Sequence, residues 1–152
     1  MSPYRILLAD DHVLFREGLK RILGELPDLE IIGEAGNGLE LLKLLEKVNP
    51  QMVLLDISMP NLRGIETARQ IKMKYPQMKI LILTMHRERE YLYEAISAGV
   101  EGYLLKEDAE KELLAAIEMI RQGEGFLSPI LRAELGEKHK VLPQFLKFFM
   151  DS

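Results

Sequence analysis

The 152-residue sequence has no cysteine and no long hydrophobic segment. Without cysteine there can be no disulfide framework and no thiolate metal site, and an intracellular protein is favoured. The apolar runs have only the length of β-strands, and the N-terminus lacks the basic-then-apolar pattern of a signal peptide. We therefore expect a cytoplasmic protein that has no contact with a membrane.

An excess of basic residues is also missing. The chain carries 20 Lys and Arg residues against 24 Asp and Glu residues, a formal net charge of −4. This charge gives no electrostatic footprint for DNA or RNA, so any DNA contact is expected to need a further domain. The length, with 47% hydrophobic residues, suits one well-buried domain with a short appendage.

Short apolar runs alternate with longer segments of helical period along most of the chain. The predicted strands are residues 5–9, 29–33, 52–55, 80–83 and 102–105. The predicted helices are residues 13–26, 38–48, 63–75, 88–98 and 109–122. This alternation is typical of βα units around a parallel sheet, so we expect five strands and five helices. Charged residues within 29–34 indicate that the second strand lies at an edge.

Three carboxylates follow two of the predicted strands. Asp10 and Asp11 come after the run 6–9, and Asp56 ends the run 52–55. The carboxyl ends of parallel strands meet at one edge of the sheet, where such carboxylates repel one another unless a hard divalent cation neutralises them. Taken singly, each residue is equally well explained as a helix cap or a turn residue. The three together favour phosphoryl chemistry with a bound cation.

Two further polar residues end neighbouring strands. Thr84 follows the fourth predicted strand, and Lys106 follows the fifth. A hydroxyl and an ammonium group facing a carboxylate cluster can bind the oxygens of a phosphoryl group. Alone, the threonine is explained as a good strand residue and the lysine as a solvated one.

In this order, the residues resemble the receiver domain of bacterial two-component response regulators over about residues 4–122. The motif comprises Asp10-Asp11, Asp56 with Met59-Pro60 and Gly64, Thr84, and Lys106-Glu107. Details such as 16–19 (Arg-Glu-Gly-Leu) and 126–129 (Phe-Leu-Ser-Pro) are similar to the NarL/LuxR-type branch. The resemblance implies a flavodoxin-like (CheY-like) doubly wound sheet with strand order 2-1-3-4-5, and a receiver domain over residues 1–125.

The resemblance also implies a role for each residue at this edge. Asp56 would take a phosphoryl group from a sensor histidine kinase. Asp11 and Asp56 would ligate Mg²⁺ beside the main-chain carbonyl of Ser58, with Asp10 acting largely through water. His12 has no second histidine at ligand spacing, so we interpret it as a helix-start residue rather than a metal ligand.

Three residues are expected to respond to the phosphoryl group. Lys106 would pair with its oxygens, and Thr84 would close its hydroxyl onto them. Tyr103 would then turn inward, so that the surface of the fourth helix, fifth strand and fifth helix changes. The protein would promote only its own phosphorylation and dephosphorylation and would not be an enzyme acting on other substrates.

Residues 126–152 depart from the transcription factors of this branch, because they are too short for a helix-turn-helix domain. We assign them to a linker and an amphipathic helical tail with an apolar stripe at Leu142, Phe145, Leu146 and Phe149. The stripe suits either a helix packed on its own domain or an interface, so a homodimer is among the expected partners.

Two functions therefore stay open. The first is a signalling switch whose full-length form controls transcription, and the second is a stand-alone receiver or phosphorelay module that acts through protein contacts. An aspartyl-nucleophile phosphatase is disfavoured because Ser58 stands where a second acid is needed. A flavodoxin-like nucleotide binder is disfavoured because no glycine-rich loop follows the first strand.

Overall fold

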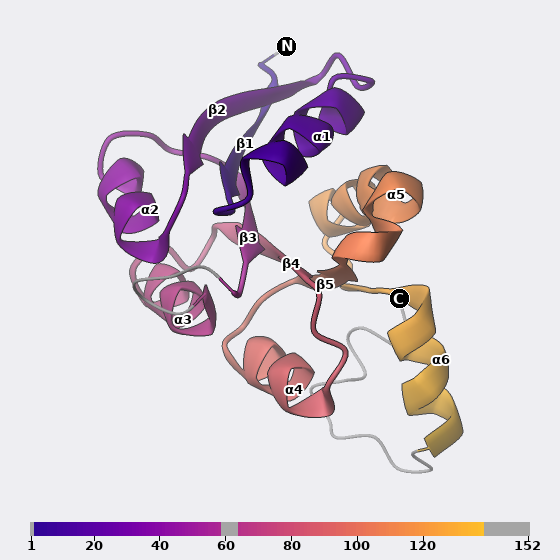
Figure 1. The fold of residues 1–152 in the computed structure, drawn as a ribbon. Helices are drawn as coiled ribbons and strands as arrows, with labels where there is room; N and C mark the ends of the chain where they lie inside the picture. Colours follow the sequence, from indigo (N-terminus) through magenta and orange to yellow (C-terminus); the bar gives the residue numbers. More distant parts are fainter. Residues whose placement is uncertain (1, 59–63, 139–152) are drawn as a thin grey trace.

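In the computed structural model of the chain, residues 2–58 and 64–138 are described. Their centre is a parallel sheet of six strands in the order β2-β1-β3-β4-β5-β6 (Figure 1). The strands are β1 (Tyr4–Ala9), β2 (Leu29–Ala35), β3 (Met52–Asp56), β4 (Lys79–Thr84), β5 (Gly102–Leu105) and β6 (Phe126–Leu127). The predicted parallel α/β architecture is confirmed.

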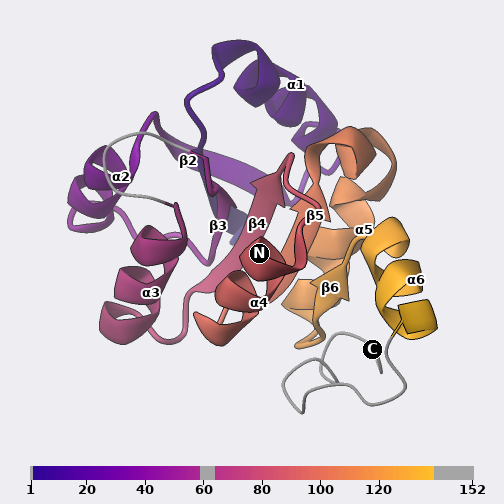
Figure 2. The same ribbon diagram turned by 60° about the horizontal axis from the view of Figure 1, so that its bottom comes forward.

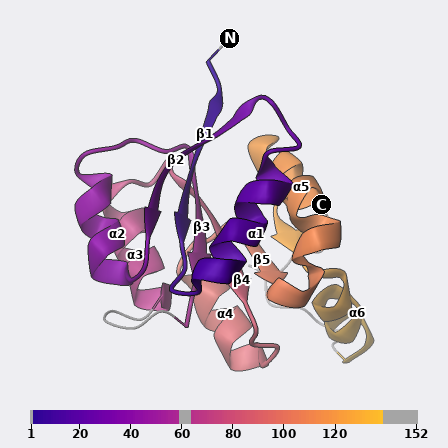
Figure 3. The same cartoon turned by 45° about the horizontal axis from the view of Figure 1, so that its top comes forward.

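Helices cover both faces of the sheet, and α1 and α5 lie together on one face (Figure 3). The helices are α1 (Val13–Leu23), α2 (Gly38–Leu45), α3 (Gly64–Lys74), α4 (Arg89–Ser97), the 3₁₀ turn η1 (Lys106–Asp108), α5 (Ala109–Arg121) and α6 (Pro129–Lys138). Among the described residues, no helix is long and apolar enough to cross a membrane.

The core consists of two layers, one on each side of the sheet. Successive side chains of a strand point to opposite faces, so β3 contributes Met52 and Leu54 to the α1/α5 layer and Val53 and Leu55 to the α2/α3/α4 layer. All five residues of β3 are buried, which explains its unbroken apolar run. Asp56, the last residue of β3, therefore lies at the buried end of a strand in the middle of the sheet.

The prediction of five strands was wrong by one. β6 extends the sheet beyond β5 at residues predicted to begin the linker, as Figure 2 shows. The Phe126 N–H donates to the Glu101 carbonyl and the Ser128 N–H to the Tyr103 carbonyl, both at 3.0 Å. The buried Ser128 Oγ accepts the Leu105 N–H at 2.8 Å. A two-residue strand has too few positions to show a periodicity, which is why the pattern did not reveal it.

The C-terminal segment is described only as far as residue 138. After β6 the chain forms α6, in a region for which the sequence had suggested no particular helix, and Leu131 of α6 is buried in the α2/α3/α4 layer. The predicted amphipathic tail with its stripe at 142–149 lies outside the described residues.

Candidate phosphoacceptor site

The site lies at the carboxyl edge of the sheet, where four strands end. Asp10 follows β1, Asp56 is the last residue of β3, Thr84 is the last of β4, and Lys106 comes directly after β5. Because the strands are parallel and adjacent, their topology brings these four residues to one place. The buried residues of the set are Asp10, Asp56 and Thr84, each with an exposed fraction of at most 1%.

The carboxylates form one cluster that could hold a metal ion. Asp10, Asp11, Asp56 and His12 each offer a ligand atom, and these four atoms lie within 4.8 Å of one another. Asp10 and Asp56 are buried, while Asp11 and His12 are exposed. Carboxylate oxygens are the ligands that hard divalent cations prefer, so the donor set fits such a cation.

Asp56 is held at both carboxylate oxygens. Its Oδ1 accepts the Ser58 N–H at 2.9 Å, and its Oδ2 accepts a hydrogen bond from Lys106 Nζ at 3.3 Å. Burial raises the pKa of Asp56, the hydrogen bond from Ser58 and the charge of Lys106 oppose this, and the negative charge of Asp10 adds to it. The two donors therefore fix the orientation of the carboxylate.

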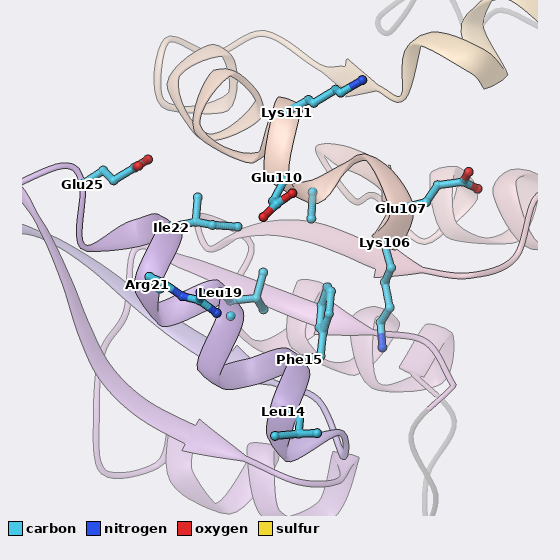
Figure 4. Close-up of a pocket in the computed structure, with 12 residues that line it drawn as sticks. Leu14, Phe15, Leu19, Arg21, Ile22, Glu25, Lys106, Glu107, Glu110 and Lys111 are labelled. Carbon is cyan, nitrogen blue, oxygen red and sulfur yellow. The ribbon is translucent and has the colours of Figure 1, made fainter.

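Lys106 is the cation of the site. Its Nζ lies 2.8 Å from Asp10 Oδ2, 3.3 Å from Asp56 Oδ2 and 3.2 Å from His12 Nδ1. The ammonium group also sits 4.5 Å from the centre of the Phe15 ring, which extends from α1 (Figure 4). Phe15 and Lys106 line one end of a groove of about 600 Å³ between α1 and α5. The lysine is thus positioned by contacts on several sides.

The turn that carries the acid pair has its own anchor. Arg16 donates from Nη1 to the Asp10 carbonyl, and its Nε lies 3.2 Å from Glu34 Oε1 at the end of β2. The His12 N–H donates to Asp10 Oδ1 at 2.7 Å. The sequence pattern assigned Arg16 no role. Its place in the first turns of the helix that follows the acid pair was the available signal.

The loop after β4 is tied to Thr84 and Tyr103. Thr84 Oγ1 accepts the His86 N–H at 3.0 Å, and the buried Tyr103 O–H donates to the His86 carbonyl at 2.9 Å. Burial raises the pKa of Tyr103, and the nearby Thr84 hydroxyl opposes this. The His86 ring stacks on Tyr91, with centroids 4.1 Å apart, and its Nε2 lies 3.1 Å from Ser58 Oγ. Tyr103 therefore points inward in this structure.

Comparison with known proteins places this site in a family. Residues 6–118 match the response regulator receiver domain. The transcriptional regulatory protein DegU of Brevibacillus brevis is 36% identical over 141 residues, which are 93% of this chain and 60% of that protein. The nitrate/nitrite response regulator protein NarL of Escherichia coli strain K12 is 36% identical over 138 residues, covering 88% of this chain and 64% of NarL.

A solved structure agrees with these relatives. The crystal structure of a two-component response regulator of the LuxR family from Aurantimonas sp. SI85-9A1 superposes with a TM-score of 0.85 at 35% identity, covering 90% of this chain and 98% of that one. The chain spans 60% and 64% of the lengths of the two curated relatives. The match over residues 6–118, the fold and the acidic edge together show that the chain belongs to the response regulator receiver domain family, in its NarL/LuxR-type branch.

Proposed function

We propose that Asp56 accepts a phosphoryl group from the phosphohistidine of a sensor histidine kinase. One observation carries this proposal: the buried Asp56 carboxylate ends the central strand within reach of both Lys106 and the acid pair. Its Oδ1 accepts the main-chain Ser58 N–H, and its Oδ2 accepts from the Lys106 side chain, which can move to a phosphoryl oxygen, so Oδ2 is the proposed nucleophile. Asp11, Asp56 and the Ser58 carbonyl are the groups proposed to hold Mg²⁺, with Asp10 acting through water.

The proposed transfer is a single displacement at phosphorus. Asp56 Oδ2 forms a P–O bond while the P–N bond to the donor imidazole breaks, and the leaving nitrogen takes up a proton from solvent. Mg²⁺, when bound, neutralises part of the charge on the phosphoryl oxygens. Lys106 moves its hydrogen bond from Asp56 to one of these oxygens, and the carboxylate becomes an acyl phosphate. Hydrolysis of this acyl phosphate by water releases inorganic phosphate and restores the Asp56 carboxylate, and we propose that the protein promotes only its own phosphorylation and dephosphorylation.

We propose that Thr84 and Tyr103 report the phosphoryl group to the α4-β5-α5 surface. Support comes from the loop after β4, whose first hydrogen bonds go to these two side chains. A hydroxyl that turns toward the phosphoryl group changes the contacts of the loop that leads into α4. The expected output is control of transcription through a DNA-binding segment other than this domain, as the names of the relatives suggest. A cytoplasmic location fits this output.

Phosphorylation by a small donor tests the acceptor directly. The purified chain is incubated with acetyl phosphate and Mg²⁺, and the adduct is located by mass spectrometry. We expect one phosphoryl group on Asp56 and none in Asp56→Asn. The control Asp28→Asn removes an exposed carboxylate beside Arg121 and should be phosphorylated like the wild type. A phosphoryl group that persists in Asp56→Asn would show that the acceptor is another residue.

A further inference from the structure

His12 adds a nitrogen donor to a site that is otherwise made of oxygen. Its ring Nδ1 lies 3.2 Å from Asp10 Oδ1, 3.4 Å from Asp11 Oδ1 and 3.9 Å from Asp56 Oδ2. The side chain is 58% exposed, so an ion from solvent can reach it. The sequence pattern gave no reason to expect this, because no second histidine stands at ligand spacing. The carboxylates that approach the ring come instead from the ends of two neighbouring strands.

The ring of His12 makes no hydrogen bond that caps α1. His12 occupies the N-cap position of this helix, with φ −92° and ψ 102°, but its side chain makes no capping hydrogen bond. The interpretation of His12 as a helix-start residue is therefore right about its position and does not account for its ring. The printed contacts of Nδ1 all lead to the charged groups of the phosphoacceptor site.

The cluster carries more negative than positive charge. Asp10, Asp11 and Asp56 carry three negative charges as carboxylates, and Lys106 supplies one positive charge. The buried Asp10 Oδ2 accepts no hydrogen bond from any described residue, although Lys106 Nζ lies 2.8 Å away. A divalent ion would neutralise the remaining charge, and one of its water ligands would give this oxygen a hydrogen-bond donor.

We infer that the imidazole of His12 makes this site selective for borderline transition-metal ions over Mg²⁺, with Zn²⁺ as the clearest case. This inference rests on the proposed function, because it uses the same cluster. Mg²⁺ demands oxygen ligands and retains its waters, so it gains little from an imidazole. Zn²⁺ binds imidazole nitrogen together with carboxylate oxygen. The metal that occupies the phosphoacceptor site would then depend on the ions available to the protein.

The test compares two metals and two histidines. Affinities for Zn²⁺ and for Mg²⁺ are measured by calorimetry on the metal-free full chain, on His12→Ala and on His86→Ala. His86 is a matched control, since its imidazole lies at the same edge but contacts Ser58, Tyr91 and Glu88 rather than the three aspartates of the cluster. We expect His12→Ala to lose about tenfold or more in Zn²⁺ affinity, in line with the loss of one metal-site group, and to bind Mg²⁺ within about threefold of the wild type. His86→Ala should keep both affinities.

A spectroscopic measurement keeps the inference testable even if a variant folds poorly. In the wild type labelled with ¹⁵N at histidine, Zn²⁺ should shift the His12 Nδ1 resonance strongly, and Mg²⁺ should not. An unshifted His12 resonance, or equal Zn²⁺ affinity in the wild type and His12→Ala, would overturn the inference. Neither result bears on phosphorylation of Asp56 with Mg²⁺, which the mass of the Asp56→Asn variant decides separately.

Discussion

Gly64, the first residue of α3, is the position where one methyl group should do most damage to the site. A Cβ added there would lie 2.6 Å from the Asp56 carbonyl oxygen and closer still to Ile57 Cα. Both neighbours are backbone atoms, so no side chain can rotate away to relieve the contact. α3 and the end of β3 would have to separate. Inserting a methyl group into a packed region costs about 1–3 kcal/mol, and this rigid contact predicts the upper end for Gly64→Ala.

Gly18 provides the matched control for the same substitution. It lies inside α1, and a Cβ there would meet no atom within 4 Å. Gly18→Ala should therefore stabilise the protein by about 0.8–1.0 kcal/mol, the difference in helix propensity. In urea unfolding followed by circular dichroism, the free energy of unfolding should fall for Gly64→Ala and rise for Gly18→Ala. The difference between the two variants should be roughly 3–4 kcal/mol. An unfolding midpoint of Gly64→Ala equal to that of the wild type would refute the reasoning.

Three further predictions concern buried polar groups. Asp56→Asn should stabilise the metal-free protein at neutral pH. Burial raises the pKa of Asp56, so ionisation of this carboxyl at neutral pH lowers the free energy of unfolding. Unfolding measured as a function of pH should show the gain disappear in acid, where the carboxyl is protonated in both states. Glu101→Ala leaves the nearly buried Lys72 without its carboxylate and should lower the free energy of unfolding in urea by about 3 kcal/mol. The control Glu107→Ala breaks an exposed ion pair with Arg87 and should cost at most about 1 kcal/mol. Tyr103→Phe leaves the His86 carbonyl without its donor and should lower the free energy of unfolding by about 1–2 kcal/mol. Hydrogen exchange of residues 85–88 should become faster. Unchanged exchange would contradict the role of this hydrogen bond in holding the loop.

The central strands were predictable because a strand that is buried on both faces has an almost continuous apolar sequence. β3 and β4 are covered by helices on both sides, so their residues are apolar without interruption. Helix ends were less predictable. α1 was expected to continue to residue 26 and ends at Leu23, where Gly24 takes the C-cap position. β6 escaped prediction because its two residues join the sheet through backbone hydrogen bonds to β5, which side-chain patterns do not encode.

The candidate site was predictable in its members and less so in its contacts. Asp10, Asp56, Thr84 and Lys106 each follow a strand in the sequence, and parallel topology alone then brings them together. The link from Arg16 to the Asp10 carbonyl depends on how α1 lies against the end of β2. The position of the His12 ring depends on a side-chain rotamer. Neither can be read from the spacing of residues along the chain.

His86 connects the site to the loop that leads into α4. Its N–H donates to Thr84 Oγ1, and its carbonyl accepts the Tyr103 O–H, so one residue of the loop is held by both side chains. If Thr84 turns its hydroxyl toward a phosphoryl oxygen on Asp56, the His86 N–H must follow it or lose its acceptor. A shift of His86 also moves the carbonyl to which Tyr103 donates, so we expect the two side chains to respond together. Lys106 follows β5 only three residues after Tyr103, so both partners of the phosphoryl group connect to the strand that carries Tyr103.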